Sequence, residues 1–321
     1  MNRRGFARLL AGLASVVVGS GQAQTQKPRV GVIHEGGPYD AMLDGFKSGL
    51  RELGLEPGRD LLLEISDVHG ERTAAARAAH ELEQAKVNLL FSMGSSVSIA
   101  AKNATAAIPI VFATGGDAVK LGFATSPARP EGRMSGVQYL ALDLTAKRLD
   151  ILRQIVTGLK KVVTLYDPTN PARGIELTRD AARRLRVALV ELPVTSVAQL
   201  QDRFRTLRPD DADAFFYTSD AMVVSQGRFV IDTAREKKLP TMFGELSLVE
   251  QGALASYGVD FFSVGRLCAK YVQRVLAGTR PAELPIESIS RYGLEVNLRT
   301  ARELGITIPQ SILLQADKVV E

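Results

Sequence analysis

The sequence has few of the residues from which disulfides and metal clusters are built. Its 321 residues include one cysteine, Cys268, and three histidines, His34, His69 and His80. A single cysteine excludes an internal disulfide and a zinc cluster of several cysteines. The histidines lack the short spacings of structural zinc ligands, so we expect no metal site. Cys268 lies in an apolar helical segment, which is typical of a buried small hydrophobic residue.

The sequence also lacks the motifs of common α/β enzymes. It contains no G-x-x-x-x-G-K-[ST] phosphate loop. Residues 94–98 (GSSVS) do not match the G-x-S-x-G nucleophile elbow, and residues 31–37 lack the dinucleotide-binding fingerprint. We therefore expect no cofactor and a non-enzymatic protein. The alternative is an α/β enzyme in which Glu35, Asp117 and Asp220 act as acid and base.

Beyond the N-terminus, no apolar run reaches the roughly 20 residues that span a bilayer. Residues 1–23 instead resemble an export signal. Three arginines lie within the first eight residues, an apolar run covers residues 9–19, and residues 21–23 (GQA) offer a cleavage site. The paired arginines are similar to a twin-arginine signal, although a Sec signal also carries arginines. Because no cysteine lies near the cleavage point, we expect a periplasmic protein that is not a lipoprotein.

The charge of the chain gives little support to a nucleic-acid partner. The 40 lysines and arginines exceed the 35 acidic residues by five, and removal of the signal with its three arginines leaves an excess of two. The basic residues are scattered through helical segments instead of forming one face. Nucleic-acid binding requires a clustered basic surface, so we expect no such partner.

Short apolar runs alternate with amphipathic segments in the first part of the chain. We expect strands at 29–33, 61–65, 88–91 and 109–112, and helices at 39–53, 72–84 and 96–104. Strands separated by helices of this length form βαβ units, which predict a parallel sheet.

The same order of elements begins again near residue 161. We expect strands at 161–166, 187–192, 214–217 and 240–243, and helices at 171–186, 197–207 and 221–237. The identities of the residues do not repeat strongly, but the order of elements does. This pattern predicts an α/β fold with two doubly wound parallel-sheet lobes instead of one large sheet.

The C-terminal segment predicts that the chain crosses between the lobes more than twice, as in a hinged protein. A helix at 261–277 is followed by a connection with Pro281 and Pro285, a short strand near 294–297 and a helix at 298–304. We expect the first lobe to contain residues 28–140 and 260–283, and the second lobe to contain residues 141–259 and 284–321.

Several segments along the chain resemble those of the ABC transporter substrate-binding protein family, which includes binders of tryptophan and tyrosine. These segments are residues 93–96 (MGSS), 104–112 (ATAAIPIVF), 116–117 (GD), 147–149 (KRL), 167–171 (DPTNP), 252–258 (GALASYG), 304–309 (LGITIP) and 315–317 (QAD). The resemblance covers nearly the whole mature chain and implies a type I periplasmic-binding-protein fold. The chain departs from the family where Ala118 replaces a usual proline and Lys120 a small residue.

Polar loops at strand ends of the first lobe are candidate ligand contacts, because ligands of open α/β sheets bind beyond the carboxyl ends of the strands. Ser95 and Ser96 open a helix and can donate to a carboxylate, or one of them is an N-cap. Asp117 can accept from an ammonium group or cap a turn. Glu35 points into the cleft or lies in a solvated glycine-rich turn.

The second lobe offers four matching candidates. Thr169 can face the cleft, whereas the neighbouring Asn170 is better suited to cap the helix after it. Ser219 and Asp220 mirror the serine loop of the first lobe, and Asp220 is the best candidate for an ammonium or hydroxyl partner, with an N-cap as its alternative role. Tyr257 offers an aromatic wall or is a core residue.

Together these features predict a periplasmic solute-binding component of an ABC importer. We expect its lobes to close on a small polar molecule, an amino acid or related carboxylate, although a nucleoside or sugar also fits. The closed, monomeric protein would dock on the ABC permease in the inner membrane. The alternative is a periplasmic module that presents its ligand to a sensor or receptor.

Overall fold

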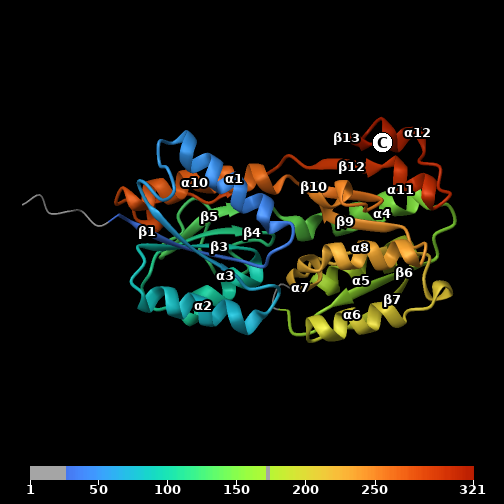
Figure 1. Cartoon of the computed structure of the whole chain (residues 1–321), viewed down its shortest axis with the longest axis horizontal. Helices are drawn as coiled ribbons and strands as arrows, with labels where there is room; N and C mark the ends of the chain where they lie inside the picture. The colour runs from blue at the N-terminus through green and yellow to red at the C-terminus, as the bar shows by residue number, and fades with distance from the viewer. Residues whose placement is uncertain (1–26, 171–173) are drawn as a thin grey trace, which may run out of the picture.

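The computed structural model describes residues 27–170 and 174–321, which form two α/β lobes (Figure 1). One lobe has a six-stranded sheet in the order β11-β5-β4-β3-β1-β2, and the other a seven-stranded sheet in the order β13-β12-β10-β9-β8-β6-β7. The prediction of two separate parallel-sheet lobes is confirmed. The expected signal in residues 1–23 and the start of the helix predicted at 171–186 lie outside the described residues.

The first lobe begins with alternating strands and helices that pair in parallel. In chain order these are β1 (Arg29–His34), α1 (Tyr39–Glu52), β2 (Leu62–Asp67), α2 (Arg72–Gln84), β3 (Leu89–Met93), α3 (Ser95–Ala104), β4 (Ile110–Thr114) and β5 (Met134–Gln138). Strands β3, β4 and β5 are fully buried. Because both faces of these strands are buried, the sequences of β3 and β4 are mainly apolar instead of alternating between apolar and polar residues.

The second lobe repeats this arrangement. Its elements are η1 (Ala141–Leu144), α4 (Thr145–Ile155), β6 (Lys161–Tyr166), α5 (Gly174–Leu185), β7 (Ala188–Pro193), α6 (Val197–Thr206), η2 (Pro209–Asp211), β8 (Ala214–Phe216), α7 (Ala221–Ser225), α8 (Gly227–Glu236), β9 (Thr241–Glu245), α9 (Ser247–Glu250) and β10 (Ala255–Val259). The order β7-β6-β8-β9-β10 matches β2-β1-β3-β4-β5 of the first sheet. The helix predicted at 221–237 is two helices, which meet at Gln226.

The remaining chain returns to the first lobe and then crosses back. It forms α10 (Phe261–Leu276), η3 (Pro281–Glu283), β11 (Glu287–Ser288), β12 (Gly293–Asn297), α11 (Leu298–Glu303), α12 (Gln310–Leu313) and β13 (Lys318–Val320). Strand β11 pairs with β5, whereas β12 pairs antiparallel with β10. The last crossing therefore follows residue 288 instead of the predicted 283, because a strand of two residues leaves no pattern in the sequence.

Helices α1 and α10 pack closely on one face of the first sheet, and α2 and α3 cover the other face (Figure 1). Glycines make the α1–α10 contact possible. A Cβ on Gly45 would collide with the carbonyl of Phe262, and a Cβ on Gly265 with the carbonyl of Met42. The contact fixes α10 to the first lobe. Among the described residues, we find no helix with both the length and the apolar character to cross a membrane.

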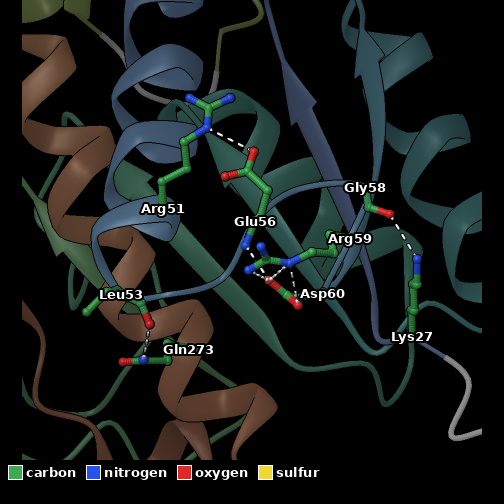
Figure 2. Close-up of polar contacts among 8 residues, drawn as sticks. All are labelled: Lys27, Arg51, Leu53, Glu56, Gly58, Arg59, Asp60 and Gln273. Atoms are coloured by element: carbon green, nitrogen blue, oxygen red, sulfur yellow. Dashed lines mark hydrogen bonds and ion pairs between the residues drawn. The ribbon is translucent and has the colours of Figure 1, made fainter.

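Polar contacts hold the loop between α1 and β2 in place (Figure 2). Arg51 donates to Glu56 at 3.1 Å, and the amide of Glu56 donates to Asp60 at 2.8 Å. From α10, the Gln273 side chain donates to the carbonyl of Leu53 at 3.3 Å, just past the end of α1. The C-terminal end of α1 is thus tied both to its own loop and to α10.

The two lobes touch through the loops that follow β1 and β2. A Cβ added to Gly70 would lie 2.6 Å from Ser225 Oγ, and one added to Gly37 would lie 3.3 Å from Ser225 Cα. Ser225 belongs to α7 of the second lobe, which lies between the lobes in Figure 1. The carboxyl ends of strands from both lobes therefore face one another across a closed interface.

Candidate ligand-binding site

A cavity of about 410 Å³, counting space open to solvent, lies between the lobes. Residues from both lobes line it: Tyr39, Ser95, Ser96, Gly115, Tyr139, Ala141, Leu142, Asn170, Tyr217, Ser219, Asp220, Ala221 and Glu245. Most of these residues follow the carboxyl ends of strands, where open α/β sheets bind their ligands. We take this cavity as the candidate ligand-binding site.

The N-terminus of α3 faces the cavity from the first lobe. Its N-cap residue is Gly94, which has no side chain to cap the first amides and adopts φ 101°. A Cβ at Gly94 would lie 3.0 Å from the Tyr39 hydroxyl oxygen, so glycine also suits the limited space. Ser95 Oγ lies 2.8 Å from Thr114 Oγ1, and Ser96 donates to Glu35 at 3.2 Å. Both predicted serines line the cavity at a helix N-terminus, which favours an anion.

Three buried tyrosines that the sequence analysis did not select form the aromatic part of the lining. Tyr39 and Tyr139 pack on Phe261 with ring centroids 5.0 and 5.5 Å away, and Tyr217 stacks on Phe243 at 5.8 Å. Burial raises the pKa of all three hydroxyls, so they remain neutral hydrogen-bonding groups.

The strand-end rule already applied to the serines could have found one of these tyrosines. Tyr217 directly follows β8, whereas Tyr139 follows β5, a strand that shows no apolar run in the sequence. Tyr39 begins α1 and directly follows the sequence Gly-Gly-Pro. The sequence signal was therefore position relative to a strand end, not residue type.

Asp220 both lines the cavity and caps α7, so its role as an N-cap leaves it beside the cavity. Its carboxylate accepts hydrogen bonds from the amides of Asp167 at 3.0 Å and Val223 at 3.3 Å and from the Asn170 side chain at 2.9 Å. The side chain is buried, and this burial raises the pKa of Asp220. The carboxylate is held rigidly by its neighbours while it faces the cavity.

Glu245, the last residue of β9, is a second buried carboxyl group that lines the cavity. It is buried, and burial raises its pKa to about 7, although the nearby Arg148 guanidinium acts in the opposite direction. Glu245 is not among the ligand contacts that the sequence predicts. Its position at a strand end is the signal that identifies it.

Arg148 of α4 is fully buried behind the cavity and ties three segments together. It donates to the carbonyl of Tyr257 at 2.8 Å, to the carbonyl of Ala141 at 2.9 Å and to Ser219 Oγ at 3.3 Å. Its guanidinium packs against Gly244, where a Cβ would lie 2.9 Å from Arg148 Cζ. Ser219 lines the cavity as predicted and is held there by Arg148.

Glu35 lies beside the cavity, in a smaller hollow that it shares with Asp220 of the other lobe. Only 2% of Glu35 is exposed, and burial raises its pKa to about 7. One carboxylate oxygen accepts from Ser96, and none of the described residues donates a hydrogen bond of normal geometry to the other. Closure of the lobes thus brings together two buried carboxyl groups.

Three further predicted contacts lie outside the cavity. Asp117 accepts from the amides of Val119 at 2.9 Å and Lys120 at 3.0 Å, so it caps a turn. Thr169 donates to Asp167 at 2.6 Å and lines a neighbouring hollow of the second lobe. Tyr257 is half-buried beside Tyr292 with ring centroids 6.4 Å apart, and it contributes only its carbonyl, to Arg148. Local hydrogen bonds and packing engage these side chains.

Asn170, which is expected as a helix cap, lines the cavity and donates to Asp220. The described part of its helix begins at Gly174.

The chain is similar to several known binding proteins. The Tyrosine-binding protein of Clostridioides difficile (strain R20291) is 24% identical over 270 residues, which are 83% of this chain and 77% of that protein. A crystal structure of a conserved domain protein from Vibrio cholerae has a TM-score of 0.83 and 26% identity, covering 92% of this chain and all of that one. The structure of an ABC domain from Streptococcus pneumoniae in complex with L-Trp has a TM-score of 0.80 and 22% identity, with the same coverage.

More distant matches include a glucose-galactose binding protein from Geobacillus stearothermophilus, with a TM-score of 0.56, 17% identity and coverage of 84% of this chain and 97% of that one. These likenesses support the type I periplasmic-binding fold. The profile described as ABC transporter substrate binding protein matches residues 29–320, nearly all of the described chain. The chain therefore belongs to the family of ABC transporter substrate-binding proteins.

Proposed function

We propose that this substrate-binding protein captures an α-amino acid with an aromatic side chain between its lobes and delivers it to the permease of its ABC transporter. The observation that carries the proposal is one interlobe cavity that combines a helix N-terminus, buried carboxyl groups and three tyrosines. Membership of a binding-protein family also confirms the expectation of a non-enzymatic protein.

The carboxylate of the ligand fits the N-terminus of α3. The first amides of a helix are unpaired, and the helix dipole favours negative charge there. The hydroxyl of Ser95 adds a donor at the same place, and Gly94 allows close approach of the backbone.

The ammonium group fits the opposite, acidic side of the cavity. Asp220 presents a carboxylate held by three hydrogen bonds, and Glu245 adds a second buried carboxyl. An ammonium group placed between them would stabilise their ionised forms, because an opposite charge at close range lowers the pKa of a buried acid.

The tyrosines favour an aromatic side chain on the ligand. Tyr39, Tyr139 and Tyr217 offer ring faces and edges that pack on an aromatic group in offset or edge-to-face geometry. The relatives point the same way, since one is named a tyrosine-binding protein and another was solved with L-Trp.

The ligand would act by holding the lobes closed. Ser96 and Asp220 come from different lobes and line one cavity, so a ligand that contacts both binds the closed form better than an open one. Proteins of this family work outside the cytoplasm. We infer periplasmic export through the segment at 1–23, by the twin-arginine or the Sec route, and action as a monomer that docks on the permease.

The proposal is tested with the mature protein and free ligands. The chain contains no tryptophan, so L-Trp fluorescence reports directly on binding. We expect L-Trp, L-Tyr and L-Phe to bind with 1:1 stoichiometry and to raise the melting temperature, with D-isomers and aliphatic amino acids much weaker. Stabilisation by sugars or nucleosides, with none by amino acids, would contradict the proposal.

Substitution of Asp220 tests the site itself. We expect Asp220→Asn to weaken amino-acid binding at least tenfold in calorimetric titration, because the ammonium group loses a charged partner. The variant also replaces one of two carboxylate oxygens that accept hydrogen bonds by an amide nitrogen, so its free energy of unfolding should fall by about 1 kcal/mol. The matched control is Asp117→Asn, a turn cap outside the cavity, which should leave affinity unchanged. Equal affinities of Asp220→Asn and the unmodified protein would exclude Asp220 as a ligand contact.

A further inference from the structure

The loops after β1 and β2 bring together two histidines and two aspartates that are scattered in the sequence. His34 ends β1 and Asp67 ends β2, and the two residues face each other in the parallel register of these strands. Asp40 lies in the first turn of α1, and His69 follows Asp67 by two residues. Spacing along the chain predicted no metal site, but neighbouring parallel strands place distant residues side by side.

Three of these residues, His34, Asp40 and Asp67, lie close enough together to share one metal ion, and the exposed His69 side chain contacts Asp67. One potential ligand atom from each of His34, Asp40 and Asp67 lies within 4.8 Å of the others. His34 Nδ1 is 3.5 Å from Asp40 Oδ1, and His69 Nδ1 is 3.2 Å from Asp67 Oδ2. Ligand atoms about 2.05 Å from a tetrahedral zinc ion lie about 3.3 Å from one another, so both pairs match an edge of that tetrahedron.

Within this group, acceptor atoms face one another without a hydrogen between them. The Gly36 amide donates to His34 Nδ1 at 3.2 Å, so this nitrogen is an acceptor and its proton lies on Nε2. His34 Nδ1 and Asp40 Oδ1 are then two acceptors facing each other at 3.5 Å, with the Asp67 carboxylate beside them. A cation among the three would convert this unfavourable arrangement into a favourable one, and its bond to Nδ1 would replace the long hydrogen bond from Gly36.

The group combines one buried potential ligand, His34, with two that are exposed to solvent, Asp40 and His69. The His34 side chain is 3% exposed, whereas those of Asp40 and His69 are 64% and 77% exposed. The amide of His69 donates to Asp67 at 2.9 Å, which holds the second loop in its turn. An ion can therefore enter from solvent and meet a positioned imidazole.

We propose that His34, Asp40, Asp67 and His69 form a binding site for one divalent transition-metal ion, with zinc the best match. Two imidazoles and two carboxylates are the ligand set that zinc accepts, whereas magnesium and calcium prefer oxygen ligands alone. The site lies at the rim of the lobe interface, apart from the residues that line the amino-acid cavity.

The location gives the metal a structural role. The two loops that it would join also contain Gly37 and Gly70, which touch α7 of the second lobe. A bound ion would fix these loops relative to each other and hold the rim in the shape that closure requires. Binding to the folded state alone also raises the melting temperature, by an amount that grows with the logarithm of the ratio of metal concentration to Kd.

The test uses the mature protein without an affinity tag, stripped of metal by a chelator. We expect Zn²⁺ to bind with 1:1 stoichiometry and to raise the melting temperature, Co²⁺ to give tetrahedral visible absorption bands, and Mg²⁺ to have no effect. His34→Gln, Asp67→Asn and His69→Gln should each weaken Zn²⁺ binding at least tenfold. The matched control is His80→Gln, since His80 is an exposed histidine of α2 outside this group.

Two results would overturn the proposal. One is the absence of 1:1 Zn²⁺ binding in the micromolar range together with no cobalt spectrum, which would mean that a protonated His34 pairs with Asp40 instead. The other is equal Zn²⁺ affinity in His69→Gln and the unmodified protein. His69 is largely exposed, so this variant folds even if His34→Gln does not, and circular dichroism verifies it. Amino-acid binding, measured separately, distinguishes failure here from failure of the proposed function.

Discussion

At the scale of single residues, the charge of the cavity depends on carboxyl groups removed from water. Burial raises the pKa of Glu245 to about 7, whereas an exposed glutamate in the unfolded chain titrates near 4.5. The folded state therefore binds more protons than the unfolded state between these two values. Stability contributed by protonated Glu245 is complete at low pH and is lost as pH rises through this window.

The variant Glu245→Gln cannot ionise, so it should lose this pH dependence. We expect its free energy of unfolding, relative to that of the unmodified protein, to rise by about 3 kcal/mol between pH 4.5 and pH 8. Denaturant titrations of the ligand-free proteins at a series of pH values measure the difference. Glu81→Gln is the control, because the Glu81 side chain is 67% exposed. A difference between the proteins that stays constant with pH would refute the assignment.

The residues of the site were predictable to the extent that they follow strand ends. This rule selected Ser95, Ser96, Ser219 and Asp220, all of which line the cavity. It also selected Asp117, whose own loop provides the amides that its side chain binds. Sequence gives no measure of this local competition between backbone and ligand for a polar side chain.

Arg148 could not be predicted as a buried residue. A charged side chain in a helix is normally solvated, and its burial depends on acceptors contributed by β10, η1 and the loop of Ser219. These acceptors come from distant parts of the chain, so no local pattern reveals them.

At the scale of elements, the α1–α10 contact depends on glycines where the helices cross. We expect Gly265→Ala to lower the free energy of unfolding by roughly 3 kcal/mol or more, because its Cβ would collide with the backbone of α1, which cannot give way. Thermal and denaturant unfolding measure the loss. The matched control is Gly227→Ala in α8, where the Cβ would meet the flexible Leu248 side chain at 3.0 Å. Similar losses in both variants would argue against a special role for the crossing.

Most strands and helices could be predicted, whereas β5 and β10 could not. The sequences of β5 (MSGVQ) and β10 (ASYGV) contain glycine and polar residues, so they show no apolar run. Both strands are nevertheless largely buried, because neighbouring strands and helices cover them. Periodicity reports amphipathic segments well, but it does not report strands whose burial comes from tertiary packing.

At the scale of the whole molecule, closure depends on the contact between α7 and the two loops of the first lobe. We expect Ser225→Phe to weaken amino-acid binding at least tenfold, since the ring would occupy the space where Gly70 meets Ser225. The melting temperature of the ligand-free protein should change little. Small-angle X-ray scattering should show that the ligand no longer compacts the variant.

Ser311→Phe serves as the control for this experiment, because Ser311 is exposed on α12. It should bind and compact like the unmodified protein. If Ser225→Phe also behaves normally, the observed contact between the lobes is not required for ligand capture.

The interleaved path of the chain has a consequence for biogenesis. The first lobe receives α10 and β11 only after β6 to β10 of the second lobe have been made. A nascent chain leaving the ribosome therefore holds an incomplete first sheet, with the apolar face that α10 will cover still open, until almost all of the polypeptide has emerged. Domains usually mature in order of synthesis, but here the N-terminal half must wait for the C-terminal one.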